Sequence, residues 1–203
     1  MIKRWLWKCF ITLSAFVFLT NTTTAQTGLD TVKVYINLDS ALKNPEAVIR
    51  LNLERSKFKK LPESVLHFKN LRELNINNNK LKDLPAWLSN LEELERLYVS
   101  KNKIEEFPEV ICELKKLKAL VLSRNDLYAI SPCIGDLTKL EALDIWETNV
   151  AALPIEMQNI KQLKLLDMRA IQMNENEQNN IRALLPAGTE VNFSEPCDCN
   201  FGE

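Results

Sequence analysis

Cysteine is the residue type in this chain whose spacing could support chemistry. The 203-residue chain has 5 cysteines. Cys197 and Cys199 are separated by a single residue, which resembles half of a metal site or a strained redox pair. No other Cys or His lies near them in the sequence to complete a tetrahedral set of ligands. A terminal disulfide, two free thiols, and metal or redox chemistry therefore stay open for this pair.

The remaining polar residues give little support for catalysis. The one histidine, His67, falls where a turn is expected, and we interpret it as a solvated turn residue. Asp144, Glu147 and Asp167 are expected near one another on adjacent strands, where Arg169 can pair with them. The glycines are too scattered to form a phosphate-binding loop. We therefore expect no enzyme activity, no cofactor and no bound metal ion.

The charge balance argues against a nucleic-acid partner. The chain has 26 Lys and Arg residues against 27 Asp and Glu residues, whereas a phosphate-binding surface needs an excess of positive charge on one face. The charges expected on the strands alternate in sign, as in Arg50 with Glu54 and Glu95 with Arg96.

The elements that position these residues follow from a repeat of 23 residues. Each unit has the form L-x-x-L-x-L-x-x-N-x-L. The units are residues 48–70, 71–93, 94–116, 117–139, 140–162 and a partial unit at 163–173. A fixed period in this range is typical of a solenoid. The fourth and sixth positions are aliphatic throughout, which predicts one short strand in each unit with these two side chains in the core.

The later positions of each unit predict a return path that closes the coil. The ninth position is mostly Asn, whose side chain can hydrogen-bond to the backbone of the turn, and this pattern fails at Ile171. The eleventh and fourteenth positions continue the core. The prolines that follow cannot donate to a strand ladder, so they belong on the return path.

The residues resemble a known family. The stretches LPESVLHFKNLRELNINNNKL, LPAWLSNLEELERLYVSKNKI and LPIEMQNIKQLKLLDM are similar to leucine-rich repeats of the LPxxI type. Such repeats occur in bacterial proteins, plant Ras-group repeat proteins and animal Ras-pathway scaffolds. The resemblance implies a right-handed α/β solenoid with a parallel sheet on its concave face, and a protein that binds other proteins.

The N-terminus has the layout of a secretory signal peptide. Residues 1–8 carry Lys3, Arg4 and Lys8, residues 9–19 are an apolar run, and a small residue precedes Gln26. We interpret residues 1–25 as the signal and expect the protein to be secreted or periplasmic, with no membrane span after processing. An uncleaved anchor is the alternative.

Polar caps are expected at both ends of the solenoid. In residues 26–47, alternation over 32–36 predicts a strand, and Asp39 or Ser40 is the expected cap of a short helix. In residues 174–203, the pattern predicts a helix over 177–185 and a last strand over 191–193, followed by the cysteine tail.

Two cysteines inside the repeats form a second candidate pair. Cys112 and Cys133 lie in neighbouring units, two positions out of register. Their α-carbons should approach the limit of about 7 Å for a disulfide. An exported protein would permit such a bond.

The candidate functional surface is the concave face of the sheet. Its outward positions, the fifth and seventh of each unit, place Tyr98, Val121 and Trp146 in one patch across three central units. The expected polar rim is Arg96, Arg124, Asp144 and Glu147. Exposed aromatic residues on rigid strands are frequent binding hot spots, although Trp146 could instead shield the strand beneath it.

We therefore predict a secreted or periplasmic protein that binds a protein partner through its concave sheet, without a cofactor. Two alternatives stay open. Without export, the resemblance to Ras-pathway proteins suggests a cytosolic scaffold or signalling regulator. A chemically active Cys197 and Cys199 tail would instead indicate a thiol or metal function.

Overall fold

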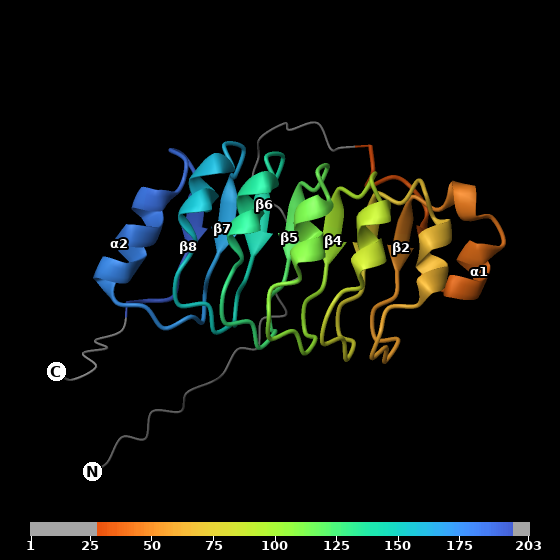
Figure 1. Ribbon diagram of the computed structural model, residues 1–203, viewed down its shortest axis with the longest axis horizontal. Coiled ribbons are helices and arrows are strands. Elements are labelled where there is room, and N and C mark those ends of the chain that lie inside the picture. Colours follow the sequence, from red (N-terminus) through yellow and green to blue (C-terminus); the bar gives the residue numbers. More distant parts are fainter. Residues whose placement is uncertain (1–27, 197–203) are drawn as a thin grey trace, which may run out of the picture. The chain divides into compact units, whose positions relative to one another are not determined.

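The computed structural model describes residues 28–196 of the chain (Figure 1). The chain divides into two compact units, residues 1–31 and 32–203. Of the first unit, only a turn at residues 28–31 is described, in which the Thr31 hydroxyl donates a hydrogen bond to the carbonyl oxygen of Gly28. The predicted signal peptide and the Cys197 and Cys199 pair lie outside the described residues.

Residues 32–196 form one parallel sheet of eight short strands, arranged side by side in chain order (Figure 1). The strands are β1 (Val34–Tyr35), β2 (Arg50–Asn52), β3 (Glu73–Asn75), β4 (Arg96–Tyr98), β5 (Ala119–Val121), β6 (Ala142–Asp144), β7 (Leu165–Asp167) and β8 (Glu190–Asn192). From β2 to β7, each residue pairs with the residue 23 positions later, as Leu51 does with Leu74. The repeat period of the sequence is thus the register of the sheet.

Short 3-10 helices on the return path cover the other side of the strands (Figure 1). They are η1 (Pro45–Ala47), η2 (Glu63–His67), η3 (Ala86–Asn90), η4 (Glu109–Glu113), η5 (Pro132–Asp136) and η6 (Ile155–Asn159). η2, η3, η4 and η6 each begin directly after a proline with extended backbone. Proline has a fixed φ and no backbone N–H that would need a hydrogen-bond partner. It can therefore begin the return path without leaving a backbone donor unpaired.

The core lies between the strands and the 3-10 helices. The fourth and sixth positions of every unit are buried. The third residue of each 3-10 helix from η2 to η6 is also buried, such as Val65 in η2 and Leu88 in η3. Phe58 and Leu153 are exceptions to the predicted core, because both are only half-buried and pack against its edge.

Asparagine side chains tie adjacent coils together at the ninth position. Asn102 donates from Nδ2 to the carbonyl of Val99 in its own coil at 2.9 Å and of Ile76 in the preceding coil at 3.1 Å. Its Oδ1 accepts the backbone N–H of Leu81 at 3.1 Å. Asn79 and Asn125 make the equivalent bonds. These bonds satisfy backbone groups inside the turns that would be costly to leave unpaired.

The asparagine ladder ends before the last coils. Thr148 donates only to the carbonyl of Ile145, within its own coil, at 2.8 Å. Ile171 is buried and apolar at the same position, as expected for the approach to a terminal cap. In the last coils other side chains replace the asparagines: the Thr189 hydroxyl donates to the carbonyl of Leu163 at 2.9 Å, and the Ser194 hydroxyl accepts the N–H of Ala170 at 2.7 Å.

A left-handed backbone conformation follows each of the strands β2 to β7, at the eighth position of the unit. The residues there have φ between 54° and 59° and none is glycine; they are Arg55, Asn78, Lys101, Arg124, Glu147 and Ala170. This conformation is disfavoured for residues other than Gly and Asn by roughly 1 kcal/mol each. It turns the chain out of the strand and directs these side chains to the edge of the solenoid.

A helix lies next to each end of the sheet. Helix α1 (Leu38–Leu42) follows β1, and its N-cap is Asn37, whose Oδ1 accepts the N–H of Ser40. The predicted cap, Asp39 or Ser40, was therefore wrong by two or three residues. Helix α2 (Glu175–Leu184) begins two residues earlier than predicted, because Asn174 and Glu177 form a reciprocal capping box.

Candidate functional site

The sheet register brings the predicted patch residues together on the concave face. Tyr98 pairs with Val121, and Val121 pairs with Asp144, so these three side chains stand in one row across β4, β5 and β6. Trp146 follows Asp144 by two residues on the same face. All four side chains are partly exposed, so Trp146 does not enter the core.

A second row, which the sequence interpretation missed, widens this patch. The third position of each unit also faces outward, because the fourth is buried and side chains alternate along a strand. Ala119 pairs with Ala142 and Ala142 with Leu165 in this row. Strict alternation around the buried fourth position would have identified it. We call Tyr98, Ala119, Val121, Ala142 and Trp146 the concave patch.

Trp146 is held in place by its neighbours. The guanidinium of Arg124 lies over the indole ring, 5.4 Å from its centroid, and Arg124 Nε is 3.0 Å from Glu147 Oε2. The backbone N–H of Trp146 donates to Asp144 Oδ1 at 3.0 Å. A cation over an aromatic face is attracted by the ring quadrupole. The predicted rim residues Arg124, Asp144 and Glu147 thus surround Trp146.

Asp144 is the most perturbed acid of the face. Burial, followed by the charge of Asp167 on the next strand, raises the pKa of Asp144 to about 6. Its oxygens accept bonds from the Trp146 N–H and the Ser123 hydroxyl. Arg169 is engaged instead with Asp167, with Nη2 2.6 Å from Oδ2. Asp144 therefore has hydrogen-bond donors within the described chain but no directly bonded cation.

Charged ladders flank the patch toward the N-terminal coils. Glu73 bonds Arg50 at 2.8 Å on one side and Arg96 at 3.2 Å on the other. In the neighbouring column, Glu95 bonds both Arg72 and Lys118. The charges thus pair between coils, 23 residues apart, as well as alternating along the chain.

Tyr98 lies at the boundary between these ladders and the apolar row. Burial, followed by the nearby charge of Glu73, raises the pKa of the Tyr98 hydroxyl. Arg96, predicted as part of the rim, lies beside it and is half-buried in the ladder with Glu73.

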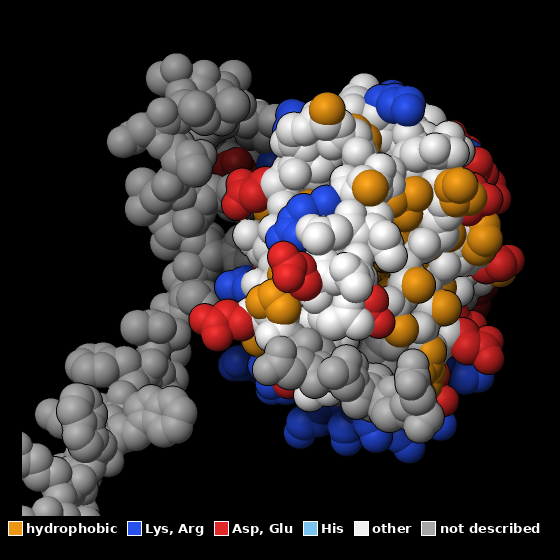
Figure 2. All heavy atoms as spheres, turned by 90° about the vertical axis from the view of Figure 1, so that its left-hand side faces the viewer, with side chains coloured by type: hydrophobic (Ala, Val, Ile, Leu, Met, Phe, Trp, Pro, Cys, Tyr) orange, Lys and Arg blue, Asp and Glu red, His pale blue; other side chains and the backbone are white. Residues whose placement is uncertain are grey.

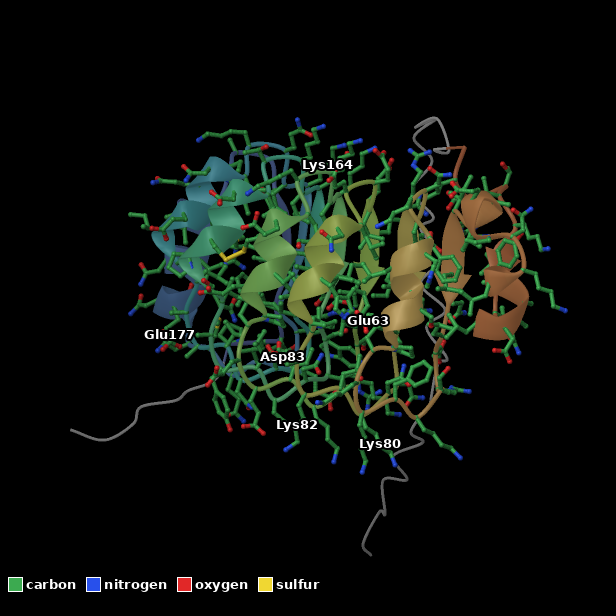
Figure 3. The ribbon with its side chains drawn as sticks, turned by 45° about the vertical axis from the view of Figure 1, so that its right-hand side comes forward. Glu63, Lys80, Lys82, Asp83, Lys164 and Glu177 are labelled. Carbon is green, nitrogen blue, oxygen red and sulfur yellow. A yellow bond between two sulfur atoms is a disulfide. The ribbon has the colours of Figure 1, made fainter. Side chains whose placement is uncertain are left out.

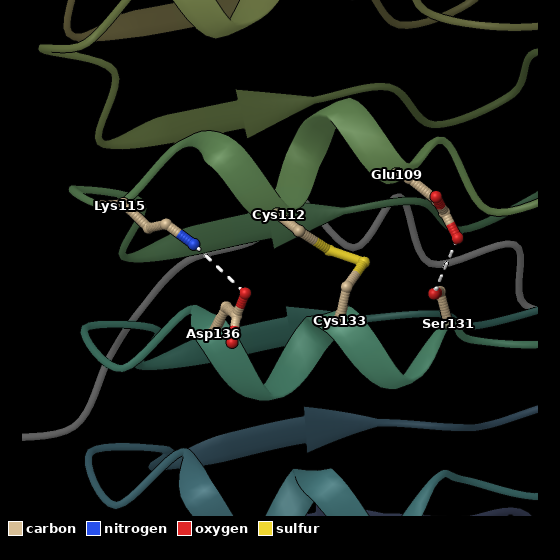
Figure 4. The surroundings of a disulfide bond; sticks show 6 residues. All are labelled: Glu109, Cys112, Lys115, Ser131, Cys133 and Asp136. Atoms are coloured by element: carbon tan, nitrogen blue, oxygen red, sulfur yellow. Dashed lines mark hydrogen bonds and ion pairs between the residues drawn. A yellow bond between two sulfur atoms is a disulfide. The ribbon is translucent and has the colours of Figure 1, made fainter.

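Cys112 and Cys133 form a disulfide on the convex side (Figure 4). It joins η4 to η5 with the α-carbons 5.7 Å apart, inside the usual range for a bridge. Two polar contacts between the same helices flank it: Lys115 with Asp136, and Ser131 with Glu109, each at 3.3 Å.

Within residues 28–196, no group of three or more His, Cys, Asp or Glu side chains could hold a metal ion. His67 is exposed at the end of η2, with its ring Nδ1 2.9 Å from the carbonyl oxygen of Ser64. In the same range, no helix has the length and hydrophobicity to cross a membrane.

The family assignment follows from the repeats. The family model for a leucine-rich repeat region matches residues 48–187, which covers all the repeats and helix α2. The chain belongs to the leucine-rich repeat family. Proteins of this family are generally protein-interaction modules. No curated protein matches this leucine-rich repeat protein.

Solved structures share the fold at low sequence identity. An internalin, inlF, from Listeria monocytogenes is 19% identical, with a TM-score of 0.52 over 73% of this chain and 42% of its own. The functional domain of InlJ from the same organism, which includes a cysteine ladder, is 21% identical with a TM-score of 0.52, over 63% of this chain and 26% of its own. The structure of PEPR1-AtPEP1 is 22% identical with a TM-score of 0.50, over 61% and 18%. This leucine-rich repeat protein therefore spans less than half of each of these chains.

Proposed function

We propose that this leucine-rich repeat protein is an exported, non-catalytic binding module that holds a protein partner on its concave patch. The observation that carries the proposal is the row of Tyr98, Val121 and Trp146 on paired, rigid strands, widened by Ala119 and Ala142. Folding does not require these residues, because Asn75 occupies the position of Tyr98 one coil earlier and Asn77 occupies the position of Trp146 three coils earlier.

The patch is suited to binding because its side chains are already ordered. Tyr98 is half-buried beside the ladder of Glu73 and Arg96, and Trp146 is fixed between Arg124 and the turn at Asp144. Aromatic side chains that lose little freedom on association give more of their burial energy to affinity. Hot spots of this kind are commonly Trp, Tyr and Arg.

The partner we favour presents an apolar side chain next to a basic one. The apolar group would cover Val121 and the two alanines. The basic group would reach Asp144, whose partly buried carboxylate has no directly bonded cation in the described chain. Pairing a desolvated carboxylate with a cation favours its charged form and adds specificity.

Export is part of the proposal. It rests on the layout of residues 1–25 and agrees with the Cys112–Cys133 disulfide, since disulfides persist in oxidising compartments. We also propose that residues 26–47 form an N-terminal cap, that residues 48–173 form the repeats, and that residues 174–203 form a C-terminal cap and tail.

The test is a double substitution, Tyr98→Ala with Trp146→Ala, with partners captured by cross-linking from the native source and identified by mass spectrometry. Binding of the captured partner should weaken by about 1,000-fold, since two hot spots are each worth about 2 kcal/mol. The matched control is Tyr128→Ala with Ile155→Ala, which removes two large side chains that are 64% and 63% exposed elsewhere.

Thermal unfolding of all variants separates lost binding from lost folding. Unchanged affinity in the Tyr98 and Trp146 double variant would place the interface away from the concave patch. Equal weakening in both double variants would argue for a non-specific apolar effect.

A further inference from the structure

A dense group of cations lies along the edge of the solenoid where the chain leaves β2, β3 and β4. We define the basic edge as Arg55, Lys57, Lys59, Lys60, Lys80, Lys82, Lys101 and Lys103. Figure 3 shows Lys80 and Lys82 extending from this edge, on the side of the molecule opposite Lys164. Figure 2 shows Lys and Arg side chains gathered along the same lower edge.

The lysines of the basic edge are not used by the fold. In the part of the chain that the structure describes, none of them forms a salt bridge, and Arg55 alone pairs, with Glu54 at 3.2 Å. At the opposite edge, Lys115, Lys116 and Lys164 have acidic partners within 3.3 Å. Three other lysines there form no salt bridge within the described residues, and they stand in separate coils: Lys69, Lys139 and Lys161. The balanced total charge and the alternating charges on the strands do not describe the basic edge, because its lysines stand in the turns after the strands.

The repeat positions of these lysines carry other residues further along the chain. The tenth position reads Lys57, Lys80 and Lys103, and then Asp126 and Asn149. The turn therefore forms equally well without a lysine. Unpaired like charges placed close together oppose folding, so their concentration in three coils calls for a reason outside stability.

The same edge becomes apolar in the later coils. The twelfth and thirteenth positions are Lys59 with Lys60 in the first unit, but Tyr128 with Ala129 in the fourth and Ala151 with Ala152 in the fifth. All four of these later side chains are exposed, and Tyr128 is 64% exposed. Ile155, at the start of η6, follows them and is 63% exposed. Acidic residues also lie on this edge: Asp83 follows Lys82 in the second unit, Glu105 and Glu106 follow Lys103 in the third, and Asp126 stands in the fourth.

We propose that this edge docks the protein peripherally on an anionic lipid surface, with the lysines on the headgroup phosphates and Tyr128 and Ile155 at the interface. Polybasic segments gain roughly 1 kcal/mol per Lys or Arg near an anionic leaflet. Tyrosine and aliphatic side chains partition into the boundary between headgroups and acyl chains. The basic edge supplies the electrostatic contribution, and Tyr128 and Ile155 supply the apolar one, along one side of the solenoid.

A nucleic acid fits the edge less well. Binding of single strands uses aromatic platforms interleaved with the cations. The one aromatic residue among the lysines, Phe58, is half-buried against the core. A phosphate backbone would not bury the exposed side chains of Ile155 and the alanines, so they would add no binding energy. Lysine also predominates over arginine here, which suits diffuse phosphate charge better than bidentate reading of bases.

The test is co-sedimentation with vesicles of equimolar phosphatidylcholine and phosphatidylglycerol, compared with vesicles of phosphatidylcholine alone. The protein is the full chain as the producing cell processes it. The edge variant is Lys59→Gln, Lys80→Gln and Lys82→Gln. The control variant is Lys69→Gln, Lys139→Gln and Lys161→Gln, which removes the same charge from exposed lysines elsewhere.

The edge variant should bind the anionic vesicles about 100-fold more weakly than the parent, and the control variant should bind nearly as the parent does. Any contribution of the N-terminal apolar run is the same in both variants and does not affect this comparison. Tyr128→Ser with Ile155→Ser should reduce the binding that persists at high salt, where the lysines are screened. Glu105→Gln with Glu106→Gln should strengthen binding, because two repelled charges are removed.

Three results would overturn the proposal. The first is equal binding to the anionic and neutral vesicles. The second is equal loss in the edge and control variants, which would indicate a response to net charge alone. The third is binding to duplex DNA or a soluble polyanion at the same ionic strength without binding to the vesicles.

Discussion

Replacing Asp144 by Asn should stabilise the protein at neutral pH. The substitution is nearly isosteric, and the chain itself shows that asparagine fits. Asn75 holds the same strand position three coils earlier, on β3, and its Oδ1 accepts the N–H of Asn77 just as Asp144 Oδ1 accepts that of Trp146. An asparagine at 144 keeps this bond and removes the charge. It also removes the repulsion between residue 144 and Asp167.

The magnitude follows from the pKa. Burial and the charge of Asp167 raise the pKa of Asp144 from 3.8 to about 6. That difference corresponds to about 3 kcal/mol, an upper bound for one group. Because the folded state holds the proton more tightly than the unfolded state, the contribution of Asp144 to stability is fully present below about pH 4 and is lost as the pH rises through about 6.

The assay is urea unfolding of the parent and of Asp144→Asn at several pH values. The difference in unfolding free energy between them should be small at about pH 4, grow up to about pH 6 and then stay constant in favour of the variant. Asp167→Asn is the matched control. Asp167 is 2% exposed and holds Arg169, so its loss should destabilise by about 2 kcal/mol. A variant less stable than the parent at pH 7, or a pH-independent difference, would refute the reasoning.

Two further predictions concern the scaffold. Cys112→Ser should lower the unfolding free energy by about 3 kcal/mol, because the bond to Cys133 closes a loop of 21 residues; reduction of the parent should reproduce the loss, and an unchanged midpoint in urea would contradict it. Asn102→Ala should cost about 3 kcal/mol, since it leaves buried backbone groups of two coils unpaired. Ser56→Ala, at the exposed ninth position of the first unit, is its control and should change stability by less than about 0.5 kcal/mol.

Much of the fold could be predicted because a fixed repeat length determines which residues of neighbouring strands pair. Aliphatic residues at the fourth and sixth positions predicted the strands, and the sheet pairs them with the same 23-residue period. The asparagine ladder followed from the chemistry of a short amide side chain beside a turn. The left-handed residues at the eighth position left no signal, because Arg55, Lys101 and Arg124 stand where glycine would have revealed that conformation.

The candidate site was predictable in part. Tyr98, Val121 and Trp146 follow from strand alternation alone, and so would Ala119 and Ala142 had the third position been included. The pairing of charges between coils depends on which strands become neighbours, which the period already implies. The raised pKa of Asp144 could not be predicted. It depends on how deeply that carboxyl is buried and on the fact that Arg169 pairs with Asp167 instead of Asp144.

The asparagine ladder also makes the local stability of the solenoid differ between its two ends. Asn79, Asn102 and Asn125 each fasten one coil to the one before it, whereas Thr148 bonds only within its own coil. Opening of the chain should therefore begin at the C-terminal coils and proceed toward the N-terminus, with amide protons beyond residue 148 exchanging with solvent first. The concave patch straddles this transition, with Tyr98 on the firmly fastened side and Trp146 at its margin.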